Sequence, residues 1–344
     1  MSYFDPISLP NAEVAYQARE LCDGQAKPLG ALGRLEDLAC WVASCQGVCP
    51  PKQIVNARAV VLAGDHGVAN AGVSAYPAAV TPAMLRGIAA GKAGVSALAQ
   101  LNHVTVSCYD ISVADDFPDL DPEISRFKLS HGTNSIDIDD ACSLDLIFPA
   151  LKIGDQIAAE QVDSGADLLI VGDLGIGNTT IAAALIAATY GWHAADVVGR
   201  GTGVDDDGLA RKTALIDAAL LRMGDKFANP VKRLGAVGSP DMAVAVGLML
   251  GAARRGVPIL LDGVIAVAEA AVAASIVPEV AYWMQAGHRS TEPGQSKALA
   301  KLGLTPILDL GMRLGEGSGA VAAVAILRCA IAALNDIAQL SALM

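Results

Sequence analysis

The chain has 344 residues, of which 53% are hydrophobic and only 4% aromatic, and its formal net charge is −12. This length suits one large α/β domain, or such a domain with a smaller companion. An apolar composition poor in aromatic residues favours helices packed on a parallel sheet over a β-sandwich. The negative charge argues against binding to nucleic acid or to an anionic membrane surface. A phosphate ligand stays compatible with it, because backbone amides and one or two cations can hold a phosphate.

The seven cysteines are scattered and form no CxxC pair. Cys45 and Cys49 are four residues apart, which raises the alternative of a metal site, but no histidine lies near them in the sequence. Reduced thiols in a cytoplasmic protein are therefore the favoured interpretation. The stretch from Met1 to Pro6 lacks the basic and apolar regions of a signal peptide. Residues 238–286 are apolar but interrupted by charges and a proline, so no membrane span is expected.

Apolar periodicity predicts alternating helices and strands along the chain. Helical spacing predicts helices over residues 10–22, 33–46, 143–163, 229–235, 239–255, 264–276 and 321–334. Continuous apolar runs predict strands over residues 57–63, 104–111, 167–171 and 258–261, with a further short run at 305–310. Another helix is expected to begin near Thr81, with Thr81 as its N-cap and Pro82 in its first turn. Residues 112–140 are expected to form a surface excursion.

Two glycine-rich turns stand out, and the first is a candidate phosphate site. The strand at 167–171 is followed by Gly172–Thr180 and then by a helix, an order that points backbone amides at an anion. The turn is neither a Walker loop nor a GxGxxG motif, so a purely structural tight turn is the alternative. The second turn, Gly199–Gly203, contains Arg200. Asp205–Asp207 then precede a helix and are interpreted as partners of its dipole, with Mg²⁺ binding as the alternative.

Polar turns around Asp65, Asp173, Arg200, Asp262 and His288 are expected to follow strand-like runs. The carboxyl ends of parallel strands share one edge of a sheet, so these turns are predicted to converge on one crevice. The turns are rich in amides and hydroxyls and show no nucleophile elbow, Cys–His pair or zinc cluster. Such a crevice suits a sugar-phosphate ligand, with one carboxylate transferring a proton.

The candidate carboxylate is Glu316, in the glycine-rich stretch 308–320 that precedes the last predicted helix. Glycines allow positive φ and a close approach of the backbone to a ligand, and an acid at a helix start is stabilised by the dipole. On this stretch alone, Glu316 could equally be a structural cap.

At Gly172–Thr180, Gly199–Gly203, Gly287–Gly294 and Gly311–Ala320, the chain resembles the nicotinate-nucleotide–dimethylbenzimidazole phosphoribosyltransferase family, and the likeness also covers 27–36, 64–68, 72–77 and 80–81. The resemblance implies transfer of phosphoribose from nicotinate mononucleotide to 5,6-dimethylbenzimidazole. The products are nicotinate and α-ribazole 5′-phosphate, with inversion at the anomeric carbon. No cofactor or metal is expected. The resemblance further implies a homodimer and a Rossmann-like parallel sheet flanked by helices.

The same resemblance implies a domain organisation. The large α/β nucleotide-binding domain is expected over residues 57–305. A small helical domain is expected to combine residues 1–56 with residues 306–344, which carry the catalytic loop.

Resemblance to the family also assigns site roles. Glu316 matches the family's general base. Residues expected to bind substrate are Asp173, Gly175, Ile176, Gly177, Asn178, Thr179, Gly201, Lys212, Gly287, Ser290, Ser74, Tyr76, Met84 and Leu314. Asp173 stands where the family usually has Glu, and Ala83 where it usually has Gln. These departures leave open a different accepted base, such as another benzimidazole, a purine or a phenol. A non-catalytic nucleotide-binding subunit is disfavoured, because Glu316 is present.

Overall fold

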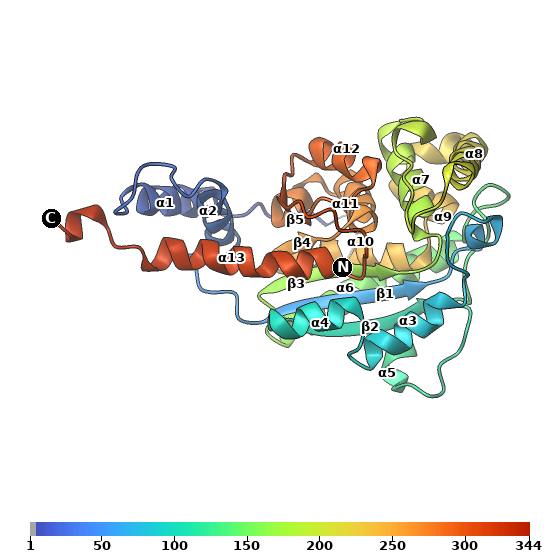
Figure 1. The fold of residues 1–344 in the computed structure, drawn as a ribbon, viewed down its shortest axis with the longest axis horizontal. Coiled ribbons are helices and arrows are strands. Elements are labelled where there is room, and N and C mark those ends of the chain that lie inside the picture. Colours follow the sequence, from blue (N-terminus) through green and yellow to red (C-terminus); the bar gives the residue numbers. More distant parts are fainter. Residues whose placement is uncertain (1–4) are drawn as a thin grey trace.

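The computed structural model describes residues 5–344, which form a parallel sheet covered by helices on both faces (Figure 1). Residues 1–4, part of the stretch without signal-peptide features, lie outside the described residues. The strands are β1 (Ala57–Gly64), β2 (Thr105–Ser112), β3 (Leu168–Leu174), β4 (Ile259–Leu261), β5 (Met284–His288) and β6 (Pro306–Leu308). They are all parallel and lie in the order β2-β1-β3-β4-β5-β6. The predicted Rossmann-like α/β sheet is therefore confirmed, and its winding reverses between β1 and β3, where ligands bind in open α/β sheets.

The strands are apolar on both faces because helices cover both. In β3, Leu169 and Val171 face one side of the sheet, whereas Leu168 and Ile170 face the other. Successive side chains of a strand point to opposite faces. A strand buried on both sides therefore reads as a continuous apolar run, which is why the runs in the sequence identified β1 and β3.

The helices divide between the two faces. The core on one face includes α6 (Leu144–Asp163), α7 (Asn178–Tyr190), α8 (Asp206–Met223), α9 (Pro230–Val237), α10 (Pro240–Arg254), α11 (Val264–Ile276) and α12 (Pro293–Leu302). The core on the other face includes α1 (Ala12–Asp23), α2 (Arg34–Gln46), α3 (Val80–Ala89), α4 (Gly94–Leu101) and α13 (Ser318–Asp336), with the short α5 (Pro122–Ser125) at its margin.

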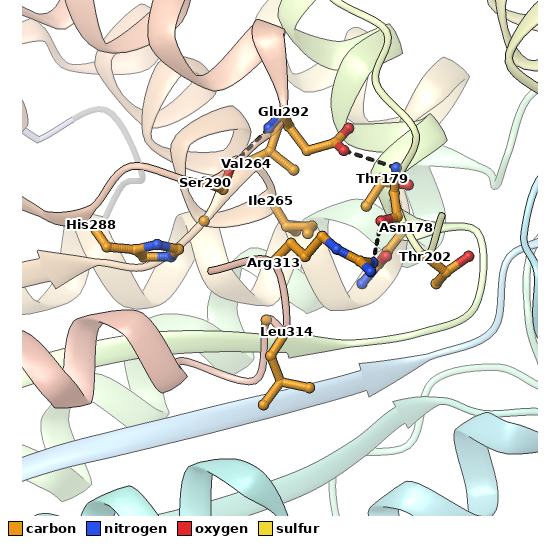
Figure 2. Close-up of a pocket in the computed structure, with 13 residues that line it drawn as sticks. Asn178, Thr179, Thr202, Val264, Ile265, His288, Ser290, Glu292, Arg313 and Leu314 are labelled. Carbon is orange, nitrogen blue, oxygen red and sulfur yellow. Dashed lines mark hydrogen bonds between the residues drawn. The ribbon is translucent and has the colours of Figure 1, made fainter. Parts of the chain in front are cut away.

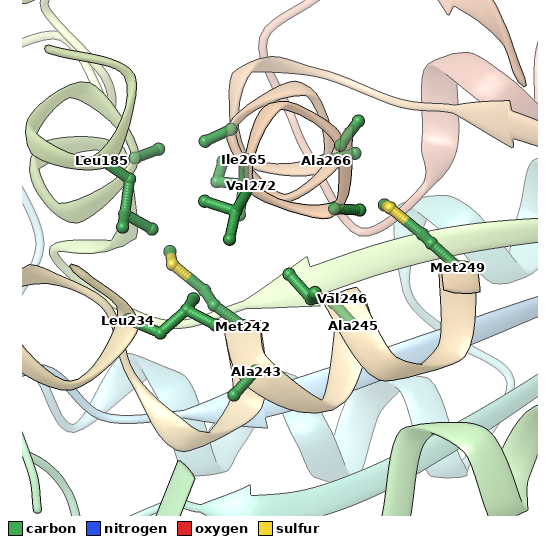
Figure 3. Close-up of a cluster of buried hydrophobic side chains, with 14 of the residues drawn as sticks. Leu185, Leu234, Met242, Ala243, Ala245, Val246, Met249, Ile265, Ala266 and Val272 are labelled. Carbon is green, nitrogen blue, oxygen red and sulfur yellow. The ribbon is translucent and has the colours of Figure 1, made fainter. Parts of the chain in front are cut away.

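α10 is the central helix of the first face. Two glycines allow it to approach α6 closely: a Cβ on Gly154 would lie 2.0 Å from the carbonyl oxygen of Val244, and one on Gly247 would lie 2.2 Å from that of Leu151. Figure 3 shows the opposite side of α10, where Met242 lies among side chains of α7, α9 and α11. This packing fixes the start of α10, which carries Asp241, directly behind the sheet.

α13 joins the start of the chain to the sheet. Near its end, Gln25 Nε2 donates to the carbonyl oxygens of Ala333 and Leu334, both at 2.9 Å. Figure 1 shows α1 and α2 beside this end of α13, far from α7 and α8. By length and composition α13 could cross a membrane, but 56% of that stretch is buried, and its buried apolar side chains pack against α2, α4 and the sheet, as in the core helix of a globular fold. The domain division at residues 56 and 305 stays a prediction.

Several predicted elements need correction. α3 begins at Val80, and Thr81 lies inside it, so the predicted N-cap is wrong; the Thr81 hydroxyl instead accepts a hydrogen bond from the Ile176 amide at 3.1 Å. Residues 112–140 are not wholly superficial, because Phe117 and Ile136 are buried in the two cores. The Arg200 turn follows a short 3₁₀ helix rather than a strand. α4 and α12 were not predicted, whereas the strand-like run expected before the His288 turn is β5.

Candidate active site

A cavity of about 510 Å³ opens at the carboxyl ends of β3, β4 and β5 (Figure 2). Its lining comes from five segments: Asn178 and Thr179; Gly201 and Thr202; Gly263, Val264 and Ile265; His288, Ser290 and Glu292; and Arg313, Leu314 and Gly315. The predicted convergence is thus confirmed for the turns around Asp173, Arg200, Asp262 and His288. Asp65 does not line the cavity; its carboxylate accepts the Ala114 amide beyond β2.

The start of α7 forms one wall of the cavity. The chain turns sharply after β3, and Gly177 adopts a φ of 96° as the N-cap, a conformation that favours glycine. Asn178 and Thr179, the first residues of α7, then face the cavity. The positive end of the helix dipole therefore points into the cavity, which suits an anionic phosphate.

Lys212 ties this wall to the second glycine-rich turn. Its buried ammonium donates to Thr179 Oγ1 at 3.1 Å and to the carbonyl oxygen of Gly199 at 2.8 Å. Burial lowers the pKa of Lys212, and the carboxylate of Glu292 partly opposes that effect. Glu292 Oε1 in turn accepts the Gly201 amide at 2.8 Å. Lys212, predicted to bind substrate, thus lies behind the cavity and holds two of its walls together.

Arg313 supplies the cation of the cavity. Its guanidinium donates to the carbonyl oxygen of Gly201 at 3.3 Å, and the side chain is otherwise exposed. Figure 2 shows Arg313 extended towards Asn178 and Thr179, with His288 at the other end of the cavity. Arg313 and Glu292 were not among the predicted binding residues. Arg313 could have been identified from the sequence, because it is a cation in the glycine-rich loop, three residues before Glu316.

Glu316 lies on the other side of the same loop. It is buried and does not line the 510 Å³ cavity, and its Oε2 accepts the Val95 amide, at the start of α4, at 3.1 Å. Glu316 was expected to interact with the N-terminus of the last helix, but its carboxylate lies instead at the N-terminus of α4. Burial raises the pKa of Glu316, the Val95 amide lowers it, and nearby Asp262 raises it further, so that the net shift is upward.

The backbone of Glu316 is strained. Its φ of 64° is left-handed, which for a residue other than glycine costs about 1–3 kcal/mol. The loop leaves no room for side chains around it: a Cβ on Gly172 would lie 2.6 Å from the carbonyl oxygen of Glu316, and one on Gly94 would lie 2.4 Å from Leu314 Cδ2. Strain of this kind persists only where surrounding contacts hold it, and such strain is concentrated at functional sites.

Asp262 provides those contacts. From the end of β4, its carboxylate accepts the amides of Gly317 at 3.1 Å, Gly319 at 2.8 Å and Ala320 at 3.0 Å, and His288 Nε2 lies 3.3 Å from its Oδ1. Burial alone would raise the pKa of Asp262, but His288 and the amides outweigh it, so its pKa lies below the ordinary value. A charged Asp262 thus fixes the start of α13 and the Glu316 turn.

Other predicted binding residues lie around the cavity rather than in it. Ser74 Oγ lies 3.0 Å from Thr202 Oγ1 at the rim, and Tyr76 is exposed in the same segment. Met84 is half-buried on α3. Gly287 does not face the cavity, because it lies in β5 against α13, where a Cβ would come within 2.6 Å of Ala320 Cα.

Asp173 and the triple aspartate have structural partners. Asp173 is buried at the end of β3, where its Oδ1 accepts a hydrogen bond from Asn178 Nδ2 at 2.6 Å. Burial and the neighbouring carboxylate of Asp241 raise the pKa of Asp173 well above its ordinary value. Asp205 caps α8 by accepting the Gly208 amide, and Asp206 pairs with Arg200. These partners support the cap interpretation of the triple aspartate. All seven cysteines are unpaired.

A parallel α/β sheet with a crevice of amides, hydroxyls and one guanidinium at its carboxyl edge is typical of enzymes that bind sugar phosphates. A family model described as "Phosphoribosyltransferase" matches residues 7–342. The nicotinate-nucleotide–dimethylbenzimidazole phosphoribosyltransferases of Mycobacterium tuberculosis and Mycobacterium leprae are both 50% identical to this chain. Each alignment covers 97% of this chain, and 92% and 94% of the respective relatives.

Solved structures agree with these sequence matches. The crystal structure of CobT from Thermus thermophilus superposes with a TM-score of 0.92 at 39% identity, over 96% of this chain and 98% of that one. The chain belongs to the nicotinate-nucleotide–dimethylbenzimidazole phosphoribosyltransferase family and is a glycosyltransferase-type enzyme that transfers phosphoribosyl groups.

Proposed function

We propose that the chain transfers the phosphoribosyl group of nicotinate mononucleotide to 5,6-dimethylbenzimidazole, with Glu316 as general base. Relatives that carry this name are half identical over nearly the whole chain. The observation that carries the role of Glu316 is its placement: a buried carboxylate with a raised pKa, held in a strained turn of the loop whose other side lines the cavity. A strained and buried acid with a perturbed pKa is typical of a catalytic group.

The chemistry requires one base. The nicotinate ring is cationic at its ring nitrogen while bound to ribose, so it leaves with the electron pair of the breaking C–N bond and needs no acid. One benzimidazole nitrogen forms the new bond to the anomeric carbon, and the proton on the other nitrogen passes to Glu316. A raised pKa matches the carboxylate better to an azolium proton, since general bases act best with a pKa near the operating pH.

The loop 313–316 gives the two substrates separate sides. Arg313 faces the cavity, where it and the start of α7 would hold the phosphate, while Glu316 faces the start of α4. A benzimidazole that approaches from the Glu316 side would attack the anomeric carbon on the face opposite the departing nicotinate ring. This arrangement supports inversion, with the α-anomer as product.

Acceptance of a different base is the second candidate. Ala83, where the family usually has Gln, is an exposed residue of α3 that offers no side-chain hydrogen bond. The apolar wall that results would bind flat rings by shape more than by polar contacts, so a purine or a phenol would compete with benzimidazoles.

A homodimer and a cytoplasmic location also stay predictions; light scattering after size exclusion tests the homodimer.

The decisive experiment replaces Glu316 by Gln and supplies nicotinate mononucleotide with a panel of bases. We expect nucleotide binding to persist while kcat falls about 10²–10⁴-fold, the usual contribution of a general base. Mass spectrometry identifies the product with each base, and NMR of the anomeric proton gives its configuration. Glu13→Gln, on the exposed face of α1, is the matched control. Near-normal turnover by Glu316→Gln would contradict the base assignment, and a β-configured product would contradict inversion.

A further inference from the structure

A second group of buried side chains lies behind the Gly172–Thr180 turn. His66 follows β1, Asp173 ends β3, and Asp241 begins α10. One potential ligand atom from each of the three lies within 4.8 Å of the others, and all three residues are buried. They are far apart in the sequence, which is why no metal site was predicted from it.

The free atoms of these side chains point at one another. Asp241 uses Oδ1 to accept from the Ser112 hydroxyl at 2.9 Å, and Asp173 uses Oδ1 for Asn178. The second oxygen of each aspartate, and both ring nitrogens of His66, have no hydrogen-bond partner within residues 5–344. The side chain of His66 is 0% exposed, and its Nε2 lies 3.9 Å from Asp241 Oδ2. Buried polar atoms without partners cost about 1–3 kcal/mol each, so a group of them calls for an explanation.

The charge of the region also needs compensation. Glu269 of α11 is fully buried close to Asp173 and Asp241, and neither of its oxygens has a partner in the described part of the chain. Among the ion pairs of residues 5–344, none brings a lysine or arginine to Asp173, Asp241 or Glu269. A buried carboxylate is stable only if it is protonated, paired or bound to a cation.

We infer that His66, Asp173 and Asp241 form a binding site for a divalent transition-metal ion. One imidazole nitrogen and two carboxylate oxygens are ligands that zinc, manganese and iron share, and they leave further coordination positions open. Tetrahedral ligands at about 2.1 Å from an ion lie about 3.4 Å apart. The 3.9 Å between His66 Nε2 and Asp241 Oδ2 needs only about 0.5 Å of closure to match this.

The ion would act on the architecture of the active site. It would join the ends of β1 and β3 to the start of α10, at the point where the sheet reverses its winding. Through the hydrogen bond from Asn178 to Asp173, it would steady the residue that opens α7 and lines the cavity. This role does not depend on the proposed reaction or on Glu316.

The test uses the full chain after dialysis against a chelator. Zn²⁺, Mn²⁺ and Co²⁺ are each titrated, with bound metal measured by mass spectrometry of the elements and Tm by calorimetry. We expect about one ion per chain, and a Tm increase of about 2–4 °C at saturating metal. Co²⁺ should add visible d–d absorption. Absence of saturable binding for all three metals would overturn the site, and the carboxylates would then be neutralised by a shared proton.

Two variants and a control locate the ion. His66→Leu removes a ligand and fills its place with an apolar group. Asp241→Asn keeps the oxygen that accepts from Ser112. Each should lose the stoichiometric ion and the Tm increase, whereas His193→Gln, on the exposed surface, should keep both. Circular dichroism verifies folding, and either variant alone suffices if the other fails to fold. Unchanged binding by a folded variant would contradict the site, even if transferase activity is normal.

Discussion

The buried acids at the carboxyl edge of the sheet differ in how many hydrogen-bond donors they have: Asp262 has several, whereas Asp173, Asp241 and Glu269 have few. Asp262 accepts three backbone amides at the start of α13 and lies against His288. Within residues 5–344, Asp173, Asp241 and Glu269 together accept only two side-chain hydrogen bonds, from Asn178 and Ser112. The pKa of Asp262 is accordingly lowered, whereas burial raises the pKa of both Asp173 and Glu269 well above the ordinary values.

The comparison shows that burial alone does not decide the charge of an acid. Backbone amides keep Asp262 ionised in the interior, since hydrogen bonds to the charged form favour it. Without such donors, an acid takes up a proton or a cation. Glu316 is intermediate, because it is buried and has one amide partner, from Val95. This intermediate number of hydrogen-bond donors suits a general base, which has to be charged before it accepts a proton and neutral afterwards.

The largest effect is expected from Asp262→Ala. The variant leaves three amides of α13 without an acceptor, so the free energy of unfolding should fall by about 3–5 kcal/mol, and turnover should fall with the loss of the Glu316 turn. Urea denaturation measures the first and steady-state kinetics the second. Asp205→Ala is the matched control, since it removes an exposed cap that serves one amide and should cost about 1 kcal/mol. Equal losses in the two variants would contradict the special role of Asp262.

A smaller effect of the opposite sign is expected from Glu269→Leu. Neither oxygen of Glu269 has a partner within residues 5–344, so an apolar group of similar size should leave stability unchanged or raise it by up to about 2 kcal/mol. Urea denaturation again measures the change. In Glu292→Leu, by contrast, the Gly201 amide loses its acceptor and stability should fall. A loss of stability in Glu269→Leu would show that Glu269 has a bound partner.

The smallest effect concerns the pH dependence of kcat/KM. A general base works when deprotonated, and the pKa of Glu316 is raised, so activity should begin to fall on the acid side at a pH above the ordinary glutamate value of 4.5. Val95→Pro removes the amide that lowers this pKa, while proline is tolerated in the first turn of a helix. The acid limb should therefore move to higher pH. A limb that stays in place, with Val95→Pro folded and active, would show that a different group titrates.

Much of the fold could be predicted from the sequence, because continuous apolar runs identified the buried strands β1 and β3. A strand-like run was expected before the His288 turn, but the bounds of β5 were not predicted, since Met-Gln-Ala-Gly-His has little strand preference. α4 and α12 were missed; neither begins with a side-chain N-cap, whereas the similarly short α9, which was predicted, is capped by Asn229. The convergence of the glycine-rich turns followed from the parallel sheet. The partners of Glu316 could not be predicted, because α4 and the Asp262 carboxylate reach it only through tertiary packing.

The position of α13 in the sequence has a consequence for biosynthesis. α13 follows all the strands, yet it covers Leu168, Ile170 and Leu260 on one face of the sheet. During translation the sheet is therefore complete before this face is covered, and Asp262 has no amides to accept until Gly317–Ala320 have left the ribosome. A chain interrupted before α13 would expose an apolar surface, and its Glu316 turn would lack the contacts of Asp262 with the Gly319 and Ala320 amides. An unfinished chain is therefore prone to aggregate through this uncovered face, since exposed hydrophobic surface promotes association.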